Sequence, residues 1–357
     1  MIKVLITEDS PVVRGYLKYI LDSDPEIEVV GVAKDGEEAV AMVEQSKPDV
    51  VTMDIHMPKM DGYQATRKIM ETSPVPIVIC SASWNPEEVD KTFRTMEAGA
   101  VAALEKPRGM GHPDSEASVS ELLKTVKLMS GVKVVRRWAK DRKKAASKRE
   151  KIPTKPEERV TAAHNIKLIA MGSSTGGPLV LQTIISGLPK NFPIPMVIVQ
   201  HIAPGFLSGL AEWLDRTTGY PVQIAENDET VKPGRVYLAP DGFQIGIDKS
   251  LKVHLNDEEP KQSLCPSVSH FFESVARNLG KQSVGVLLTG MGRDGARELK
   301  SLRDLGAITI AQDKETSVVH GMPGEAIKIG GASLVLPSTQ IAEKIVELTV
   351  KKEIVKS

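Results

Sequence analysis

The chain has 357 residues, 46 basic and 46 acidic side chains, and a formal net charge of +0. Its length favours two domains, and its balanced charge gives no whole-chain attraction to nucleic acid or to an acidic membrane surface. No apolar run approaches the roughly 18 residues of a membrane-spanning helix, and the first residues lack the pattern of a signal peptide. We therefore expect a cytoplasmic protein without membrane insertion.

The first part of the chain alternates short apolar runs with amphipathic stretches. The runs expected as strands are 3–7, 29–33, 49–54, 76–80 and 100–106. Helical periodicity is found at 11–23, 36–45, 62–72 and 87–99. A fivefold alternation predicts an α/β domain with a doubly wound parallel sheet, whose binding crevice lies at the carboxyl ends of the strands.

Five polar residues stand at those strand ends: Glu8, Asp9, Asp54, Ser81 and Lys106. Converging carboxylates repel one another unless a cation joins them, and oxygen ligands of this kind suit Mg²⁺. A carboxylate beside Mg²⁺, with a lysine and a hydroxyl nearby, is suited to accept a phosphoryl group. Any one of these acids alone would be read as a helix cap or a solvated loop residue, but the set of five predicts a site.

Two segments of this first part resemble the response-regulator receiver family. DIHMPKMDG (54–62) matches the family pattern D-x-x-M-P-x-M-D-G, and ALEKP (103–107) matches the segment around its lysine. The resemblance covers residues 1 to about 130 and implies a flavodoxin-like fold. Ser81 stands where threonine is commoner. Ala103 stands where many receivers have an aromatic side chain, which argues against an aromatic switch here.

The resemblance also implies roles for the residues at the strand ends. Asp54 is the implied phosphoacceptor, with a histidine kinase as phosphodonor. Asp9 and Asp54 are implied ligands of Mg²⁺, together with the backbone carbonyl of His56, whose side chain is expected to be a bystander. Glu8 supports the site, and Lys106 is the family lysine.

A strongly basic stretch separates the two halves. Ten lysines and arginines lie between Lys133 and Lys151, opposed only by Asp141 and Glu150. Because large apolar residues are sparse, we interpret residues 131–163 as a solvated linker. An arm that binds nucleic acid is the alternative, but no aromatic or glycine-rich binding pattern accompanies the charge.

The second half again indicates an α/β domain, over residues 164–350. Strands are expected at 167–172, 195–200, 283–290 and 307–312, with helices at 178–188, 207–217, 267–280 and 295–306. Residues 221–255 alternate and carry Gly, Pro and Asp turn signals, which predicts an inserted antiparallel ribbon. Both cysteines, Cys80 and Cys265, lack metal-ligand spacing and are expected to be buried free thiols.

Three chemically active residue types again follow predicted strands. GSSTGG (172–177) follows the first strand, His201 the second, and Asp294 a glycine-rich turn after the third. A hydroxyl, an imidazole and a carboxylate at one sheet edge are the parts of a nucleophile, base and orienting acid. GSSTGG could instead cradle a phosphate of a nucleotide, but it lacks the G-x-G-x-x-G pattern and a following lysine. Asp294 could equally cap the helix that follows it.

Four segments resemble, in order, those of the CheB-type chemotaxis protein-glutamate methylesterases, a Rossmann-like catalytic domain behind a receiver. They are AMGSSTGGP (170–178), VIVQHIAPGF (197–206), LTGMGRDGA (288–296) and VVHGMPGEA (318–326). The match covers the whole chain. Ser173 stands where alanine is usual in the family, which leaves open whether a second hydroxyl takes part in the reaction.

Carried over residue by residue, the resemblance makes Ser174 the nucleophile, His201 the base and Asp294 the third member. It implies hydrolysis of γ-glutamyl methyl esters, and deamidation of glutamines, on the cytoplasmic helices of chemoreceptors. For the oxyanion we propose the backbone N–H of Met291, assisted by Thr175. This domain needs no metal or organic cofactor.

The combination of two sites predicts regulation: the receiver shields the catalytic crevice until Asp54 is phosphorylated. The competing class is a non-enzymatic module that docks on receptors or on another signalling protein. The complete Ser/His/Asp set argues against this alternative, and the sequence contains no recognisable helix-turn-helix for a DNA-binding output.

Overall fold

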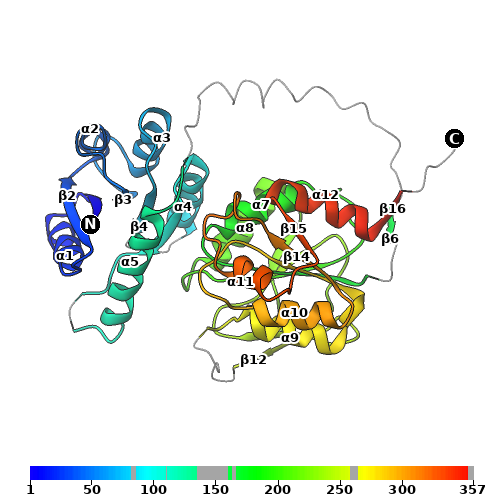
Figure 1. The fold of residues 1–357 in the computed structure, drawn as a ribbon. Coiled ribbons are helices and arrows are strands. Elements are labelled where there is room, and N and C mark those ends of the chain that lie inside the picture. The colour runs from blue at the N-terminus through cyan, green and yellow to red at the C-terminus, as the bar shows by residue number, and fades with distance from the viewer. Residues whose placement is uncertain (82–85, 110, 135–159, 163–165, 258–263, 353–357) are drawn as a thin grey trace, which may run out of the picture. The chain divides into compact units, whose positions relative to one another are not determined.

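The computed structural model describes residues 1–81, 86–109, 111–134, 160–162, 166–257 and 264–352 (Figure 1). The chain divides into two compact units, Met1–Ile152 and Pro153–Ser357. Most of the predicted basic linker, residues 135–159, lies outside the described residues. Within the described ranges, no helix is both long and apolar enough to cross a membrane.

The first unit is a five-stranded parallel sheet covered by helices, as predicted. The strands are β1 (Ile2–Thr7), β2 (Ile27–Ala33), β3 (Val50–Met53), β4 (Ile77–Ser81) and β5 (Ala102–Glu105), in the order β2-β1-β3-β4-β5. The helices are α1 (Pro11–Asp22), α2 (Gly36–Ser46), α3 (Gly62–Thr72), α4 (Pro86–Ala98) and α5 (Ser115–Ser130). Every residue of the central strand β3 is buried, as expected where helices cover both faces of a sheet.

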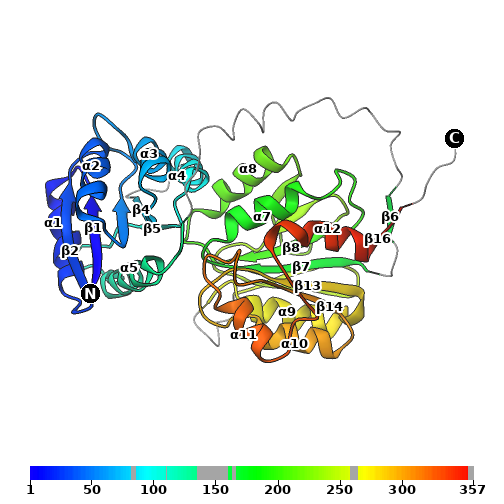
Figure 2. The ribbon, with the colours of Figure 1, turned by 45° about the horizontal axis from the view of Figure 1, so that its top comes forward.

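The second unit contains a seven-stranded parallel sheet in the order β15-β14-β13-β7-β8-β10-β9. Its strands are β7 (Leu168–Ser173), β8 (Met196–Gln200), β9 (Val222–Ile224), β10 (Val236–Leu238), β13 (Ser283–Leu287), β14 (Ile308–Gln312) and β15 (Leu334–Leu336). The helices are α7 (Gly177–Ser186), α8 (Leu207–Thr218), α9 (Val268–Asn278), α10 (Ala296–Asp304), α11 (Met322–Lys328) and α12 (Ser338–Thr349). Helices α7, α8 and α12 cover one face, and α9, α10 and α11 the other (Figure 2).

The predicted antiparallel ribbon at 221–255 is only half right. Strands β11 (Gln244–Ile247) and β12 (Val253–Asn256) do form an antiparallel hairpin. The first half of the segment instead supplies β9 and β10, which join the main sheet in parallel. All three residues of β10 are buried beside β8. The short apolar run 236–238 is therefore a core strand, and the turn residues on either side of it led to the prediction of a hairpin.

A short antiparallel pair joins β6 (Val160–Ala162) to β16 (Val350–Lys352). The sequence did not predict β6, which lies within the segment interpreted as linker.

Both cysteines are free, as expected. Cys80 is buried, and burial raises the pKa of its thiol to about 12. Cys265 is only half-buried, so the expectation of burial was wrong there.

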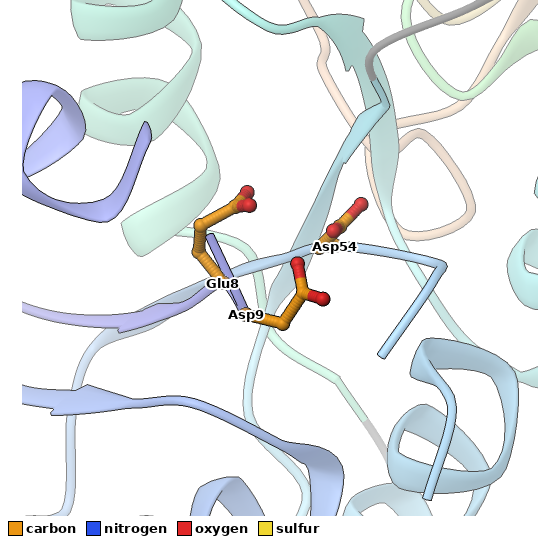
Figure 3. A group of neighbouring side chains, drawn as sticks. All are labelled: Glu8, Asp9 and Asp54. Carbon is orange, nitrogen blue, oxygen red and sulfur yellow. The ribbon is translucent and has the colours of Figure 1, made fainter. Parts of the chain in front are cut away.

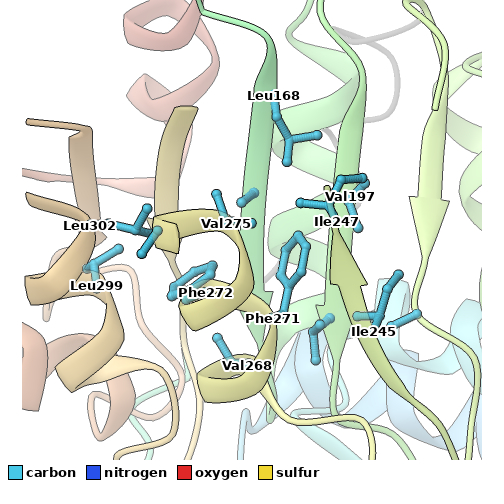
Figure 4. Close-up of a cluster of buried hydrophobic side chains, with 14 of the residues drawn as sticks. Leu168, Val197, Ile245, Ile247, Val268, Phe271, Phe272, Val275, Leu299 and Leu302 are labelled. Atoms are coloured by element: carbon cyan, nitrogen blue, oxygen red, sulfur yellow. The ribbon is translucent and has the colours of Figure 1, made fainter. Parts of the chain in front are cut away.

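A large apolar cluster fixes helix α9 against the sheet of the second unit (Figure 4). Phe271 and Phe272 of α9 are fully buried, with ring centroids 6.0 Å apart. A Cβ added at either Gly172 or Gly295 would lie 2.3 Å from Val268, the first residue of α9. These two glycines therefore let the N-terminus of α9 approach the ends of β7 and β13, where the candidate site lies.

Candidate functional site

The acidic residues predicted for the first site lie together at the carboxyl edge of the first sheet (Figure 3). Glu8 and Asp9 follow β1 and Asp54 follows β3, two strands that pair in parallel. Ligand oxygens of the three side chains lie within 4.8 Å of one another. Lys106, beyond β5, places Nζ 2.7 Å from Glu8 Oε2 and 3.0 Å from Asp54 Oδ2. The topology therefore gathers four of the predicted residues.

Burial dominates the electrostatics of this first site. It raises the pKa of the Glu8 and Asp54 carboxyls, and Lys106 offsets the rise only in part. Burial alone would lower the pKa of the Lys106 ammonium, but the hydrogen bond to Glu8 and the charge of Asp54 leave it raised. The site thus holds more negative charge than its one lysine balances, which fits a divalent cation with oxygen ligands.

The loop after β3 holds Asp54 by close backbone packing. Asp54 Oδ1 accepts a hydrogen bond of 2.8 Å from the amide of Ile55. The amide of Gly62 donates to the carbonyl of Ile55 across the loop. A Cβ at Gly62 would lie 2.1 Å from the Asp54 carbonyl oxygen, so only glycine fits there.

A second anchor of this loop was not predicted from the sequence. Lys59, in the left-handed region at φ 62°, places Nζ 2.7 Å from Asp35 Oδ2. Asp35 is buried and caps α2 through the amide of Glu38. The amide of Gly36 also donates to the carbonyl of Met60. The signal was present as an Asp before a helical run, but the partner on the loop depends on the fold.

The remaining predicted residues of the first unit have simpler surroundings. Ser81 is buried at the end of β4, at the same sheet edge. The His56 side chain is exposed, and a role for its carbonyl as a metal ligand stays a prediction. Ala103 is half-buried in β5.

The second set of predicted residues lies at the carboxyl edge of the seven-stranded sheet. Ser174 follows β7, His201 follows β8, and Asp294 lies in the loop between β13 and α10. His201 Nε2 and Asp294 Oδ2 are 2.9 Å apart. Because Nε2 faces the carboxylate, the neutral ring carries its proton there, and Nδ1 is the nitrogen left to accept a proton.

Helix α9 stabilises Asp294 as a carboxylate. The amides of Val268 and Ser269 donate to its two oxygens at 2.7 and 3.0 Å, and the Ser267 hydroxyl donates at 3.0 Å. Burial acts to raise the pKa of the Asp294 carboxyl, but hydrogen bonds from His201 and Ser269 outweigh it and hold that pKa well below its usual range. The positive end of the α9 dipole acts in the same direction. Asp294 is therefore an acceptor aimed at His201, and not a cap of the helix that follows it.

In the loop after β7, the backbone carbonyls accept hydrogen bonds from other parts of the second unit. The Ser173 carbonyl accepts from the His201 amide, and the Thr175 carbonyl accepts from the Thr289 hydroxyl. The Ser174 amide donates to the Thr289 carbonyl. Among the described residues no acceptor contacts the amide of Thr175 or of Met291. Whether these N–H groups bind an oxyanion stays a prediction.

Gly290 brings Met291 close to Ser174. A Cβ at Gly290 would lie 2.7 Å from Ser174 Cβ and 2.4 Å from Met322 Sδ. The Gly290 amide donates to Val319, and its carbonyl accepts from Gly321 and Met322, so the turn is fixed on both sides. Met291 itself is 47% exposed.

Ser173 differs from its neighbour in environment. Its side chain is fully buried, and its hydroxyl donates to Gln200 Oε1 at 2.6 Å, whereas Ser174 is only half-buried. Gln200 was not among the predicted residues. The available signal was a polar residue that ends a buried apolar strand, VIVQ.

The first unit has the fold and the acidic sheet edge of a response-regulator receiver, and the second is an α/β domain with a serine, a histidine and an aspartate at one sheet edge. Residues 4–112 match the family model "Response regulator receiver domain", and residues 169–345 match "CheB methylesterase". The chain belongs to the CheB methylesterase family.

Full-length relatives agree with this assignment. A protein-glutamate methylesterase/protein-glutamine glutaminase 1 of Syntrophus aciditrophicus is 52% identical, over 98% of each chain. A protein of the same name, number 4, from Geobacter metallireducens is 51% identical, over 99% of this chain and 100% of its own. The crystal structure of the Thermotoga maritima CheB methylesterase catalytic domain is 44% identical and matches 51% of this chain and 98% of its own, with a TM-score of 0.50.

Proposed function

We propose that the protein hydrolyses γ-glutamyl methyl esters on the cytoplasmic helices of chemoreceptors, with Ser174 as nucleophile, His201 as base and Asp294 as orienting acid. The observation that carries this proposal is the 2.9 Å contact between His201 Nε2 and Asp294 Oδ2, at the sheet edge where Ser174 lies. The names of the full-length relatives support the substrate class.

The geometry supports a two-step acyl transfer. Ser174 Oγ attacks the ester carbonyl carbon while His201 Nδ1 takes the hydroxyl proton. The C–O bond to the methoxy group then breaks, and His201 returns the proton so that methanol leaves. A water molecule, deprotonated by His201, then attacks the acyl-enzyme; the bond to Ser174 Oγ breaks, His201 returns the proton to that oxygen, and glutamate leaves. A glutamine side chain follows the same route, with ammonia as the leaving group.

Charge that develops on the carbonyl oxygen needs donors already in place. The N–H groups of Met291 and Thr175 are the candidates, and one such donor typically contributes about 3–4 kcal/mol to the transition state. Asp294 stays ionised because its pKa is held low, so it stabilises the imidazolium that forms on His201.

We infer that phosphorylation of Asp54 regulates this activity, with a histidine kinase as phosphodonor. Mg²⁺ fits Glu8, Asp9 and Asp54, and when bound it neutralises charge on the phosphoryl oxygens. Lys106 offers its ammonium to the same oxygens, and the Ser81 hydroxyl offers a hydrogen bond. The receiver family match supports this regulation, and receptor substrates would place the protein in the cytoplasm.

Methanol release from methylated chemoreceptor membranes tests both the proposed esterase activity and its proposed regulation by phosphorylation. The unaltered chain should release methanol, and a small-molecule phosphodonor should increase the rate. Ser174→Ala should reduce release to background, while a serine-reactive probe should label the unaltered chain at Ser174 only. Persistent activity of Ser174→Ala would remove the proposed nucleophile. Receptor binding without methanol release would favour the docking module.

A further inference from the structure

The geometry points to a positioning pair, Ser173 and Gln200, that fixes the nucleophile Ser174 relative to the base His201. The inference rests on the proposed function and deepens it. Gln200 is the last residue of β8, is 3% exposed, and lies opposite Ser173 of β7 in the parallel register. The reacting residues Ser174 and His201 are the next ones along the two strands.

One amide spans the two chain segments. Gln200 Nε2 donates to the Ser174 carbonyl at 2.8 Å and to the His201 carbonyl at 2.7 Å. Its Oε1 accepts from the Ser173 hydroxyl at 2.6 Å. Carbonyl oxygens only accept hydrogen bonds, so the amide can satisfy all three contacts in this orientation alone. The two carbonyls set that orientation, and the Ser173 hydroxyl adds the hydrogen bond that ties the amide to β7.

The start of α7 closes over the pair. A Cβ at Gly177 would lie 2.1 Å from Gln200 Oε1 and 2.9 Å from Ser173 Cβ. The Gly177 amide also donates to the Ser174 carbonyl at 2.8 Å. The missing side chain at this position therefore makes room for the Gln200 amide beneath the loop that carries Ser174.

This arrangement also gives the second serine a role. The Ser173 hydroxyl is fully buried and donates its proton to Gln200, so it faces the sheet and not the substrate. Neither residue touches reacting atoms, and both act through the backbones of Ser174 and His201. A misplacement of reacting groups by about 1 Å can cost roughly 100-fold in rate, so this pair controls the turnover number kcat and leaves KM unchanged.

Ser173→Ala and a matched control, Ser283→Ala, test the inference in the full-length protein. Both serines are fully buried, but Ser283 begins β13 at the opposite end of the sheet and donates to the Gly280 carbonyl. We expect Ser173→Ala to lower kcat for methanol release about tenfold with KM unchanged, the loss of about one hydrogen bond. Ser283→Ala should lower the melting temperature similarly and leave kcat within about twofold. Equal effects of the two substitutions on kcat would overturn the inference.

Gln200→Met removes both donors and should lower kcat about 100-fold. In that background Ser173→Ala should add no further loss, because the amide that its hydroxyl binds is gone. A kcat for Gln200→Met within about twofold of the unaltered chain, or losses that simply multiply, would overturn the inference. If Gln200→Met does not fold, the Ser173 and Ser283 pair decides the matter alone. If the unaltered chain itself releases no methanol, it is the proposed function that fails.

Discussion

Asp54 and Asp294 are a natural comparison because both stand at the carboxyl edge of a parallel sheet, each with a side chain 6% exposed. Burial acts to raise the pKa of each carboxyl, yet the pKa of Asp54 is raised and that of Asp294 is lowered. Asp54 has acidic neighbours and shares one lysine with Glu8. Asp294 accepts hydrogen bonds from the first residues of α9 and from His201.

The difference shows that hydrogen-bond donors, and not depth of burial, decide the direction in which the pKa of a buried carboxyl shifts. The receiver edge is left short of positive charge, which suits a site that recruits a cation and a phosphoryl group. The catalytic edge is complete within the protein, which suits a carboxylate that must stay ionised and hold an imidazole in place. Each prediction below tests one side of this contrast.

The largest effect is expected at the catalytic edge. Asp294→Asn keeps the side-chain shape but removes the charge that orients and stabilises His201, and should lower kcat for methanol release by about 10⁴-fold. The melting temperature of the second unit should also fall, because α9 loses its anionic partner. A near-normal kcat in the Asp294→Asn variant would contradict the role given to this carboxylate.

The matching change at the receiver edge has the opposite sign in stability. Asp54→Asn removes a charge whose burial is unfavourable, together with its repulsion by Asp9, and should raise the melting temperature of the first unit by about 2–4 °C. It should also abolish the response of methanol release to a phosphodonor, while basal release stays unchanged. A lower melting temperature would show that the Lys106 contact outweighs the cost of burying the Asp54 charge.

A glycine substitution tests how tightly the receiver loop holds Asp54. Gly62→Ala forces the backbone around the Asp54 carbonyl to move and should cost about 1–3 kcal/mol of stability, with loss of phosphorylation from a phosphodonor. Gly15→Ala on α1 is the control, because an added Cβ there meets nothing within 4 Å. It should stabilise the first unit by roughly 0.4–1 kcal/mol and leave phosphorylation intact.

The smallest effect is the pH dependence of stability. The contribution of Asp54 to stability should change above about pH 3.9, the ordinary pKa of an unfolded Asp, and that of Asp294 below it. The pKa of Asp54 is raised in the folded state, so its unfavourable contribution is relieved as the pH falls toward about 3.9. The pKa of Asp294 is lowered, so its stabilising contribution is full above about pH 3.9 and is lost below it. Unfolding of Asp54→Asn and of Asp294→Asn, each against the unaltered chain from about pH 2 to about pH 7, measures both windows.

Much of the fold followed from the sequence because strands buried on both faces read as continuous apolar runs separated by amphipathic helices. The alternation alone placed Glu8, Asp9 and Asp54 at the carboxyl edge of the first sheet. It likewise placed Ser174, His201 and Asp294 at the carboxyl edge of the second sheet. The short strands β9 and β10 were assigned to an antiparallel ribbon, and β15 was missed, because three residues carry too little pattern to fix how a strand pairs.

By itself, the sequence determined the two α/β units, their family motifs and the residue types at the two sheet edges, since these depend on local periodicity and on topology rules. Only the tertiary structure decided which partner each polar group has. Gln200 facing Ser173, Lys59 facing Asp35, and α9 pointing its amides at Asp294 all join residues far apart in the chain. Such pairings depend on packing to within an ångström, as the glycines at 62, 172 and 177 show, and no local pattern encodes them.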